Sequence, residues 1–242
     1  MNIPQNRFEQ TFSSNSQTQS LAKTFMTTVF GWMFLALGIT AVTAYLFASS
    51  ESLLSLMYNE TGMSILGWVV MLAPFGLVMF MSFKFQTMSR ANLSFMFLIY
   101  SILMGMSLSF ILLIYTQASV FSTFIVTSGT FGLMAVLGYT TNTDLTKFGS
   151  ILFMALIGII LASLVNFFMH SGTLEYIISI VGVLIFTGLT AYDVQKLKRI
   201  GMATGEYAGE SKDKLAIMGA LTLYLDFINL FLFLLRFMGN RK

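Results

Sequence analysis

Long apolar windows with few charged residues most constrain what this chain can fold into. A transmembrane helix needs about 20 consecutive, mostly apolar residues. Seven windows of that kind are present: 25–47, 63–83, 93–115, 120–139, 148–169, 176–197 and 215–236. Strand-like alternation is absent, which argues against an outer-membrane barrel, and a helical bundle is then what satisfies the backbone in lipid. We therefore predict an all-α membrane protein, with one transmembrane domain over residues 23–242.

The composition agrees with a membrane-embedded chain. Charged residues make up 10% of the 242 residues, against about 25% in soluble domains. No cysteine is present, which excludes disulfides, thiol catalysis and cysteine-ligated metals. The net charge of +3 reports membrane topology rather than a nucleic-acid partner. Residues 1–22 are polar and lack an apolar signal-peptide core, so we predict a disordered cytoplasmic tail.

The distribution of Lys and Arg predicts the orientation. Ten of these residues lie in the N-terminal tail and in the loops after spans two, four and six, and none in the other three loops. Positive charge favours the cytoplasmic side, so we predict a cytoplasmic N-terminus. Seven spans then place Arg236, Arg241 and Lys242 outside, where positive charge is disfavoured. A re-entrant last segment with both ends inside is the alternative, but the apolar length favours seven spans.

One carboxylate, Asp226, lies near the middle of the last span. Insertion scales put the cost of an acid at the bilayer centre at roughly 2.5–3.5 kcal/mol, and such residues usually face a water-filled path or a polar partner. On a helical wheel, Thr222 and Asn229 share a polar stripe with Asp226. We predict that both line a path. The alternative is a structural Asp226, hydrogen-bonded to a Ser, Thr or Tyr of the bundle.

Asp193, near the cytoplasmic end of span six, is the one candidate for a carboxylate partner of Asp226, because spans one to five contain no acid. Two carboxylates in contact cannot both ionise cheaply. Such a pair can share a proton at low pH and hold a divalent cation at higher pH, and calcium favours oxygen ligands of this kind. The alternative is an interfacial Asp193 paired with Lys196.

Enzyme signatures are missing. The sequence contains no HExxH, GxSxG, Walker loop or dinucleotide fingerprint. Paired intramembrane aspartates occur in proteases, but the flanks here, YD and LD, lack the GxGD-type context. We expect no enzyme activity and no cofactor.

Three stretches are similar to the Bax inhibitor-1 family of membrane proteins: LFMALIGIILASLVNFF (152–168), GLTAYDVQKLK (188–198) and GALTLYLDFINLFLFLLRFMGNRK (219–242). The similarity runs from about residue 25 to the C-terminus, and the sequence resembles the bacterial branch of the family. It implies a seven-helix bundle with the last helix central, wrapped by the first six. It also implies a multi-pass protein of the bacterial inner membrane.

The resemblance further implies a pH-sensitive calcium leak pathway. Asp193 and Asp226 match the aspartate pair that forms the family's pH sensor, with calcium as the transported or transiently bound ion. A basic residue at the inner end of the second helix is implied to latch onto the sixth-helix acid. Lys84 is the nearest equivalent here, although lysine is a weaker, single-point donor than the arginine of relatives.

A second activity implied by the resemblance is that of a non-conducting regulator. It would bind a membrane protease or stress and cell-death machinery, through the loop 195–214 or the N-terminal tail. A proton-coupled calcium exchanger is the third hypothesis.

Overall fold

The computed structural model of the chain describes residues 5–59, 62–203 and 209–242, and the side chains from residue 18 onward within these ranges except that of Asn59. The helices in this part are α1 (Gln5–Ser49), α2 (Glu51–Met57), α3 (Ile65–Lys84), α4 (Arg90–Ile114), α5 (Gln117–Thr140), α6 (Thr146–Met169), α7 (Gly172–Ala203) and α8 (Glu210–Met238). Seven of them are long and apolar enough to cross a membrane. The prediction of an all-α bundle with seven spans is confirmed.

The connection between α1 and α3 contains one short helix and a short β-hairpin, neither of which was predicted from the sequence. Helix α2 is followed by a two-stranded hairpin of β1 (Tyr58–Asn59) and β2 (Gly62–Met63). Ser64 then begins α3, because its hydroxyl accepts a hydrogen bond from the Gly67 N–H at 3.0 Å.

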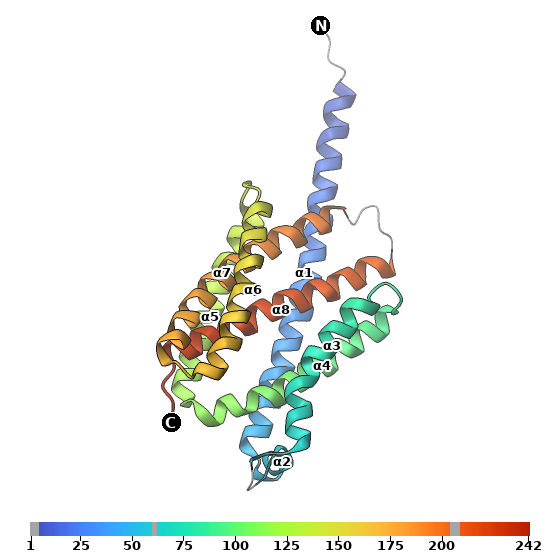
Figure 1. Cartoon of the computed structure of the whole chain (residues 1–242). Helices are drawn as coiled ribbons and strands as arrows, with labels where there is room; N and C mark the ends of the chain where they lie inside the picture. Colours follow the sequence, from blue (N-terminus) through green and yellow to red (C-terminus); the bar gives the residue numbers. More distant parts are fainter. Residues whose placement is uncertain (1–4, 60–61, 204–208) are drawn as a thin grey trace.

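Helix α8 is the central element, and in Figure 1 it crosses between the α3–α4 pair and the group of α5, α6 and α7. Two-thirds of its apolar window (67%) is buried within the protein, against 6% for α6. It packs directly on α1, α4, α5 and α7, whereas α3 packs mainly on α4 and α6 on α7. The last helix is therefore central, as expected, but four helices rather than six form its main immediate surroundings.

Contacts at the two ends of α8 show that it crosses the whole bundle. Asp213, in its first turn, pairs with Arg90 at the start of α4. Beyond its other end, Arg241 forms a β-bridge with Tyr115 at the end of α4. The start of α1 and the C-terminal tail lie at opposite ends of the molecule (Figure 1). This arrangement supports seven spans over a re-entrant last segment.

The connection between the last two helices is shorter than the predicted loop 195–214. Helix α7 continues to Ala203 and α8 already begins at Glu210. Side chains of the α7 extension hold the α5–α6 turn: Lys198 Nζ donates to the Tyr139 carbonyl at 2.7 Å, and Gln195 Nε2 donates to that of Thr143 at 2.8 Å. These contacts give the extension a packed face, which explains why it stays helical.

Helix α1 begins at Gln5, within the predicted tail of residues 1–22, and the side chains of residues 1–17 lie outside the described part. The disorder of the tail and its cytoplasmic location stay predictions.

Candidate functional site

Asp226 lies in the most buried part of the most buried helix. Its side chain is 5% exposed, and its neighbours on α8, Leu223, Phe227 and Leu230, are buried as well. Its Oδ2 atom is buried and has no hydrogen-bond partner among the described residues. Since buried polar atoms are almost always paired, an orphaned carboxylate oxygen at this depth needs a functional explanation or an unseen water or ion.

Asp193 on α7 is brought against Asp226. The two carboxyl groups lie close enough to interact electrostatically and by a hydrogen bond. Asp193 is half-buried, and the positive charge of the exposed Lys196 also acts on it. Asp193 therefore combines the two arrangements considered from the sequence: it faces a buried carboxylate and is also influenced by a lysine one turn away.

A close approach of α5 to α7 helps to position Asp193. A Cβ atom added at Gly138 on α5 would meet the backbone of Ala191, only 2.8 Å from its Cα, two residues before Asp193. Glycine is therefore required for these two helices to pack this closely.

Thr222 and Asn229 lie on a half-buried face of α8, beside the aspartate pair. Each bonds to a carbonyl of its own helix: the Thr222 hydroxyl to Met218 at 3.1 Å, and Asn229 Nδ2 to Leu225 at 2.8 Å. Their polar groups are thus satisfied locally, and the lining of a path by these two residues stays a prediction.

A hydroxyl network that the sequence reasoning missed joins α8 to α1 and α4 through Tyr224, two residues before Asp226. Thr40 Oγ1 on α1 lies 2.7 Å from the Tyr224 hydroxyl on α8 and donates to the Ser101 carbonyl on α4 at 2.9 Å. Tyr100 packs edge-on against Tyr224, and its own buried hydroxyl has no partner among the described residues. No single-sequence signal reveals this network, because Thr40 and Tyr224 are 184 residues apart.

The comparison with known proteins decides the family. A family model described as "Inhibitor of apoptosis-promoting Bax1" matches residues 22–242. The chain belongs to the Bax inhibitor-1 family. The match includes both aspartates, and the resemblance noted from the sequence motifs is confirmed.

Several bacterial relatives of this Bax inhibitor-1 protein are similar over nearly their whole length. The Inner membrane protein YbhL of Escherichia coli K12 is 46% identical over 226 residues, which are 93% of this chain and 95% of the relative. An uncharacterized protein of Borreliella burgdorferi is 47% identical over 218 residues, 90% of this chain and 92% of the relative. The protein RP147 of Rickettsia prowazekii is 43% identical over 232 residues, 96% of each chain.

The latch implied by the Bax inhibitor-1 resemblance is not assembled by Lys84. This side chain is exposed at the end of α3, and within the described part of the chain it makes no ion pair, with Asp193 or any other acid. Arg90 takes the connecting role instead: its Nη1 lies 2.6 Å from Asp213 Oδ2, and its backbone N–H donates to Glu210 Oε1 at 2.7 Å. The α3–α4 turn is therefore tied to α8 rather than to Asp193.

The site offers only part of a calcium coordination shell. Calcium takes about 6–8 oxygen ligands. No group of three or more His, Cys, Asp or Glu residues that could hold a metal is found among the described residues. Asp193 and Asp226 could thus contact a passing, largely hydrated cation rather than enclose one.

Proposed function

We propose that this Bax inhibitor-1 protein is a pH-sensitive leak pathway for cations, with calcium as the ion, and that Asp193 and Asp226 are its sensor. The observation that carries the proposal is the contact between a buried carboxyl group with an unpartnered oxygen and a second, half-buried carboxyl group. The structure of the bundle around them supports a functional over a structural Asp226, because no Ser, Thr or Tyr of the described chain bonds to its orphaned oxygen.

The pair can respond to acidity because of its geometry. When one proton is shared, the two carboxyl groups can hold each other by a hydrogen bond, and α7 and α8 are drawn together there. When both are ionised, they repel each other unless a cation lies between them. Water reaches the pair through Asp193, which is half-buried, and the positive charge of the exposed Lys196 acts on the same carboxyl group.

The compartment and orientation form part of the same proposal. The E. coli relative is named an inner membrane protein, and we propose the same membrane for this chain. Three contacts join the segments that carry the ten Lys and Arg residues: Arg90 with Asp213, Lys198 with the Tyr139 carbonyl, and Gly201 packed against Ala22. We propose that the end of the bundle where these segments meet faces the cytoplasm.

Flux into liposomes tests the proposal. The full chain is reconstituted with an entrapped calcium dye, and uptake is followed over a pH series for wild type, Asp226→Asn and Asp193→Asn. We expect the pH dependence to be lost in both variants, because a neutral amide cannot change charge. Glu51→Gln, which removes an exposed carboxylate at the start of α2, is the matched control and should keep the wild-type profile.

Two results would contradict the leak. Identical pH-dependent flux in wild type and both Asn variants would remove the aspartate pair from the mechanism. Flux driven uphill by an imposed proton gradient would instead identify a coupled exchanger, since a leak only dissipates gradients.

The non-conducting regulator remains the second hypothesis. The segment 195–214 proposed for partner contacts is partly engaged within the chain, through Lys198, Gln195, Asp213 and Lys214. Co-purification of a membrane protease in mild detergent, with and without residues 1–20, tests this hypothesis. Retention of the protease by the full chain but not by the truncated one would support it.

A further inference from the structure

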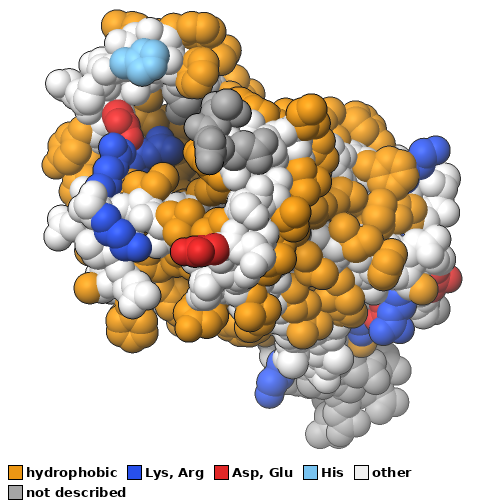
Figure 2. All heavy atoms as spheres, turned by 90° about the horizontal axis from the view of Figure 1, so that it is seen from below, with side chains coloured by type: hydrophobic (Ala, Val, Ile, Leu, Met, Phe, Trp, Pro, Cys, Tyr) orange, Lys and Arg blue, Asp and Glu red, His pale blue; other side chains and the backbone are white. Residues whose placement is uncertain are grey.

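A pocket of about 360 Å³ lies at the C-terminal end of the bundle, away from the aspartate pair. Its charged lining residues are Glu175 on α7, Arg236 on α8 and Arg241 in the C-terminal tail. Figure 2 looks onto this end and shows Lys and Arg side chains gathered around a hollow with an apolar interior. Arg236 follows Asp226 by ten residues, or about 15 Å along the helix, so the pocket is a separate site.

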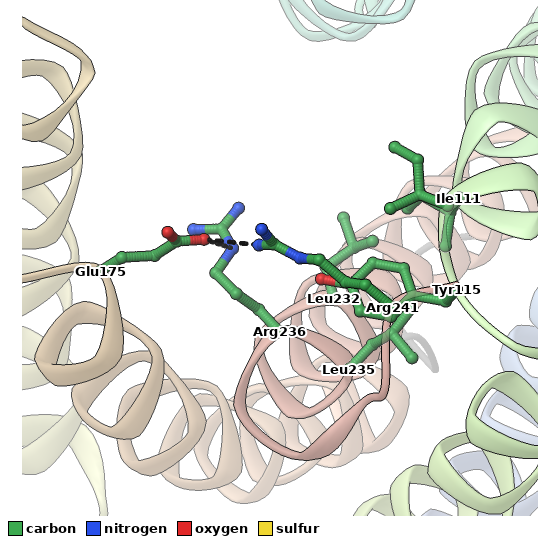
Figure 3. Close-up of a pocket in the computed structure, with 8 residues that line it drawn as sticks. Ile111, Tyr115, Glu175, Leu232, Leu235, Arg236 and Arg241 are labelled. Atoms are coloured by element: carbon green, nitrogen blue, oxygen red, sulfur yellow. Dashed lines mark hydrogen bonds and ion pairs between the residues drawn. The ribbon is translucent and has the colours of Figure 1, made fainter. Parts of the chain in front are cut away.

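The pocket carries an excess of positive charge. Arg241 Nη2 donates to Glu175 Oε1 at 3.1 Å, and Arg236 Nε lies 3.9 Å from the same oxygen. In Figure 3 both guanidinium groups point toward this one carboxylate. Each guanidinium has five N–H donors, and within the described part of the chain Arg236 donates no hydrogen bond. One carboxylate thus leaves a net charge of +1 and most of the donors unused.

The position of Arg241 is set by the backbone rather than left to a mobile tail. Arg241 forms a β-bridge with Tyr115, and its neighbours are also bonded: Asn240 N donates to Ser119 Oγ at 2.9 Å, and Lys242 N donates to the Ile114 carbonyl at 2.8 Å. The Lys242 ammonium is held nearby on the Leu112 carbonyl at 2.9 Å. Anchored cations of this kind lose little entropy when they bind an anion.

The other walls of the pocket are apolar. Ile111 comes from α4, and Leu232 and Leu235 come from α8. Figure 3 shows Tyr115 beside Arg241, whose guanidinium carbon lies 5.9 Å from the centre of the Tyr115 ring, and Ile111 farther from the arginines. The combination of aliphatic walls with guanidinium groups at the end of transmembrane helices matches the polar–apolar boundary of a bilayer lipid.

We propose that this pocket binds a phosphate group, carried by the headgroup of an anionic phospholipid or by a free phosphate ion. Guanidinium groups match phosphate because they can donate two parallel hydrogen bonds to a pair of its oxygens. The volume accommodates a glycerophosphate, since small-molecule pockets begin at about 300 Å³. Glu175 keeps the two arginines apart and oriented while neutralising only one of them. The inference is independent of the proposed leak.

Calorimetric titration of the full chain in a neutral maltoside detergent tests the proposal. The probes are a short-chain phosphatidylglycerol, the phosphatidylcholine of the same chain length, and inorganic phosphate. We expect phosphatidylglycerol to bind the wild type, and Arg236→Gln/Arg241→Gln to weaken this binding by about tenfold or more. Arg236→Lys/Arg241→Lys keeps the charge but not the paired donors, so it should bind with intermediate affinity. Helical circular dichroism and gel filtration confirm that each variant is folded.

The matched control is Lys23→Gln/Lys147→Gln, which removes two exposed positive charges at the opposite end of the bundle. It should bind within about twofold of wild type, because long-range attraction is screened beyond about 10 Å. Binding of inorganic phosphate alone, lost in the double Gln variant, would support the phosphate site and identify the free ion as its source. Equal binding of all probes to wild type and the double Gln variant, an equal loss in the control, or no binding of any phosphate-bearing probe would overturn the proposal.

Discussion

The guanidinium of Arg90, at the start of α4, lies 2.6 Å from the carboxylate of Asp213, in the first turn of α8. A second cation acts beside it: Lys214 Nζ donates to the Gln86 carbonyl at 3.2 Å and lies over the Phe85 ring. The α3–α4 turn is thereby connected to the start of the central helix. Because Lys84 takes no part in these contacts, Arg90 rather than Lys84 is the basic residue of this turn that a gating or stability experiment should address.

Replacing Arg90 should lower stability slightly, and replacing Lys84 should not. Both members of the Arg90–Asp213 pair are partly exposed, at 54% and 36%, so solvent screening limits the loss in Arg90→Gln to less than about 1 kcal/mol. Thermal unfolding in detergent measures the difference, with Lys84→Gln as control. A larger loss in Lys84→Gln than in Arg90→Gln would contradict the assignment.

Tyr224 and Tyr100 pack against each other, but removing the hydroxyl should change the stability of the protein differently in each case. Tyr224→Phe breaks the hydrogen bond to Thr40 and should cost about 1 kcal/mol, since the net contribution of a buried hydrogen bond is of that order. Tyr100→Phe removes a buried hydroxyl without a partner in the described chain, so it should be neutral or stabilising. Unfolding of both variants in one detergent provides the comparison, and an equal loss in Tyr100→Phe would show that its hydroxyl is bonded.

Asp144, in the α5–α6 turn, should stabilise the fold in a pH-dependent way. Its pKa lies below the ordinary value, first because the hydroxyl and the backbone N–H of Thr146 both donate to it, and then because Arg199 does. Because the pKa of Asp144 is lower in the folded than in the unfolded protein, its carboxylate stabilises the folded state fully at pH values above the unfolded-state pKa of about 3.9. This stabilisation declines as the pH falls below that value.

The corresponding measurement compares wild type with Asp144→Asn. At neutral pH the wild type should melt at a slightly higher temperature than Asp144→Asn. The difference between the two melting temperatures should become smaller as the pH is lowered through about 4. The effect is small because the carboxylate is exposed. A gap that does not change between neutral and acidic pH would contradict the role of the charge.

Hydropathy was enough to predict the seven spans of this architecture. The seven windows correspond to the seven long helices, because the backbone in lipid has no other local solution. The central place of the last helix was implied by the family resemblance, and the buried Asp226 agrees with it, since an acid of that cost is tolerated where other helices cover it. The end of α7 at Ala203 and the start of α8 at Glu210 could not be predicted. Both depend on contacts with distant parts of the chain, the α5–α6 and α3–α4 turns.

The parts of the site that the sequence did not reveal all depend on pairing between distant elements. Thr40 and Tyr224 are ordinary residues of apolar helices until the bundle brings them together. The three positive charges of the C-terminal segment contradicted the charge rule for seven spans. The structure places Arg236 and Arg241 beside Glu175, so part of the charge that was disfavoured on that side is neutralised locally.

Asp226→Asn should raise the stability of the protein at neutral pH, even though it should abolish the proposed pH response. The carboxylate is 5% exposed, lies beside Asp193 and keeps one oxygen without a partner. In the unfolded chain this carboxyl group is ionised and hydrated at neutral pH, so folding must either bury the charge or take up a proton, and a neutral amide of the same shape removes that cost. A gain of about 1–3 kcal/mol is the scale expected for an unsatisfied buried group.

Asp193→Asn serves as the comparison for this last experiment. Asp193 is half-buried and interacts favourably with Lys196, so its replacement should gain less stability. Unfolding of the three proteins in the same detergent, across a pH series, measures both effects. A lower stability of Asp226→Asn at neutral pH would show that the carboxylate makes a stabilising contact, and the structural interpretation of Asp226 would then replace the functional one. Natural proteins retain destabilising buried charges chiefly where function requires them, so a gain in stability together with lost pH dependence would connect the strain at Asp226 to the activity.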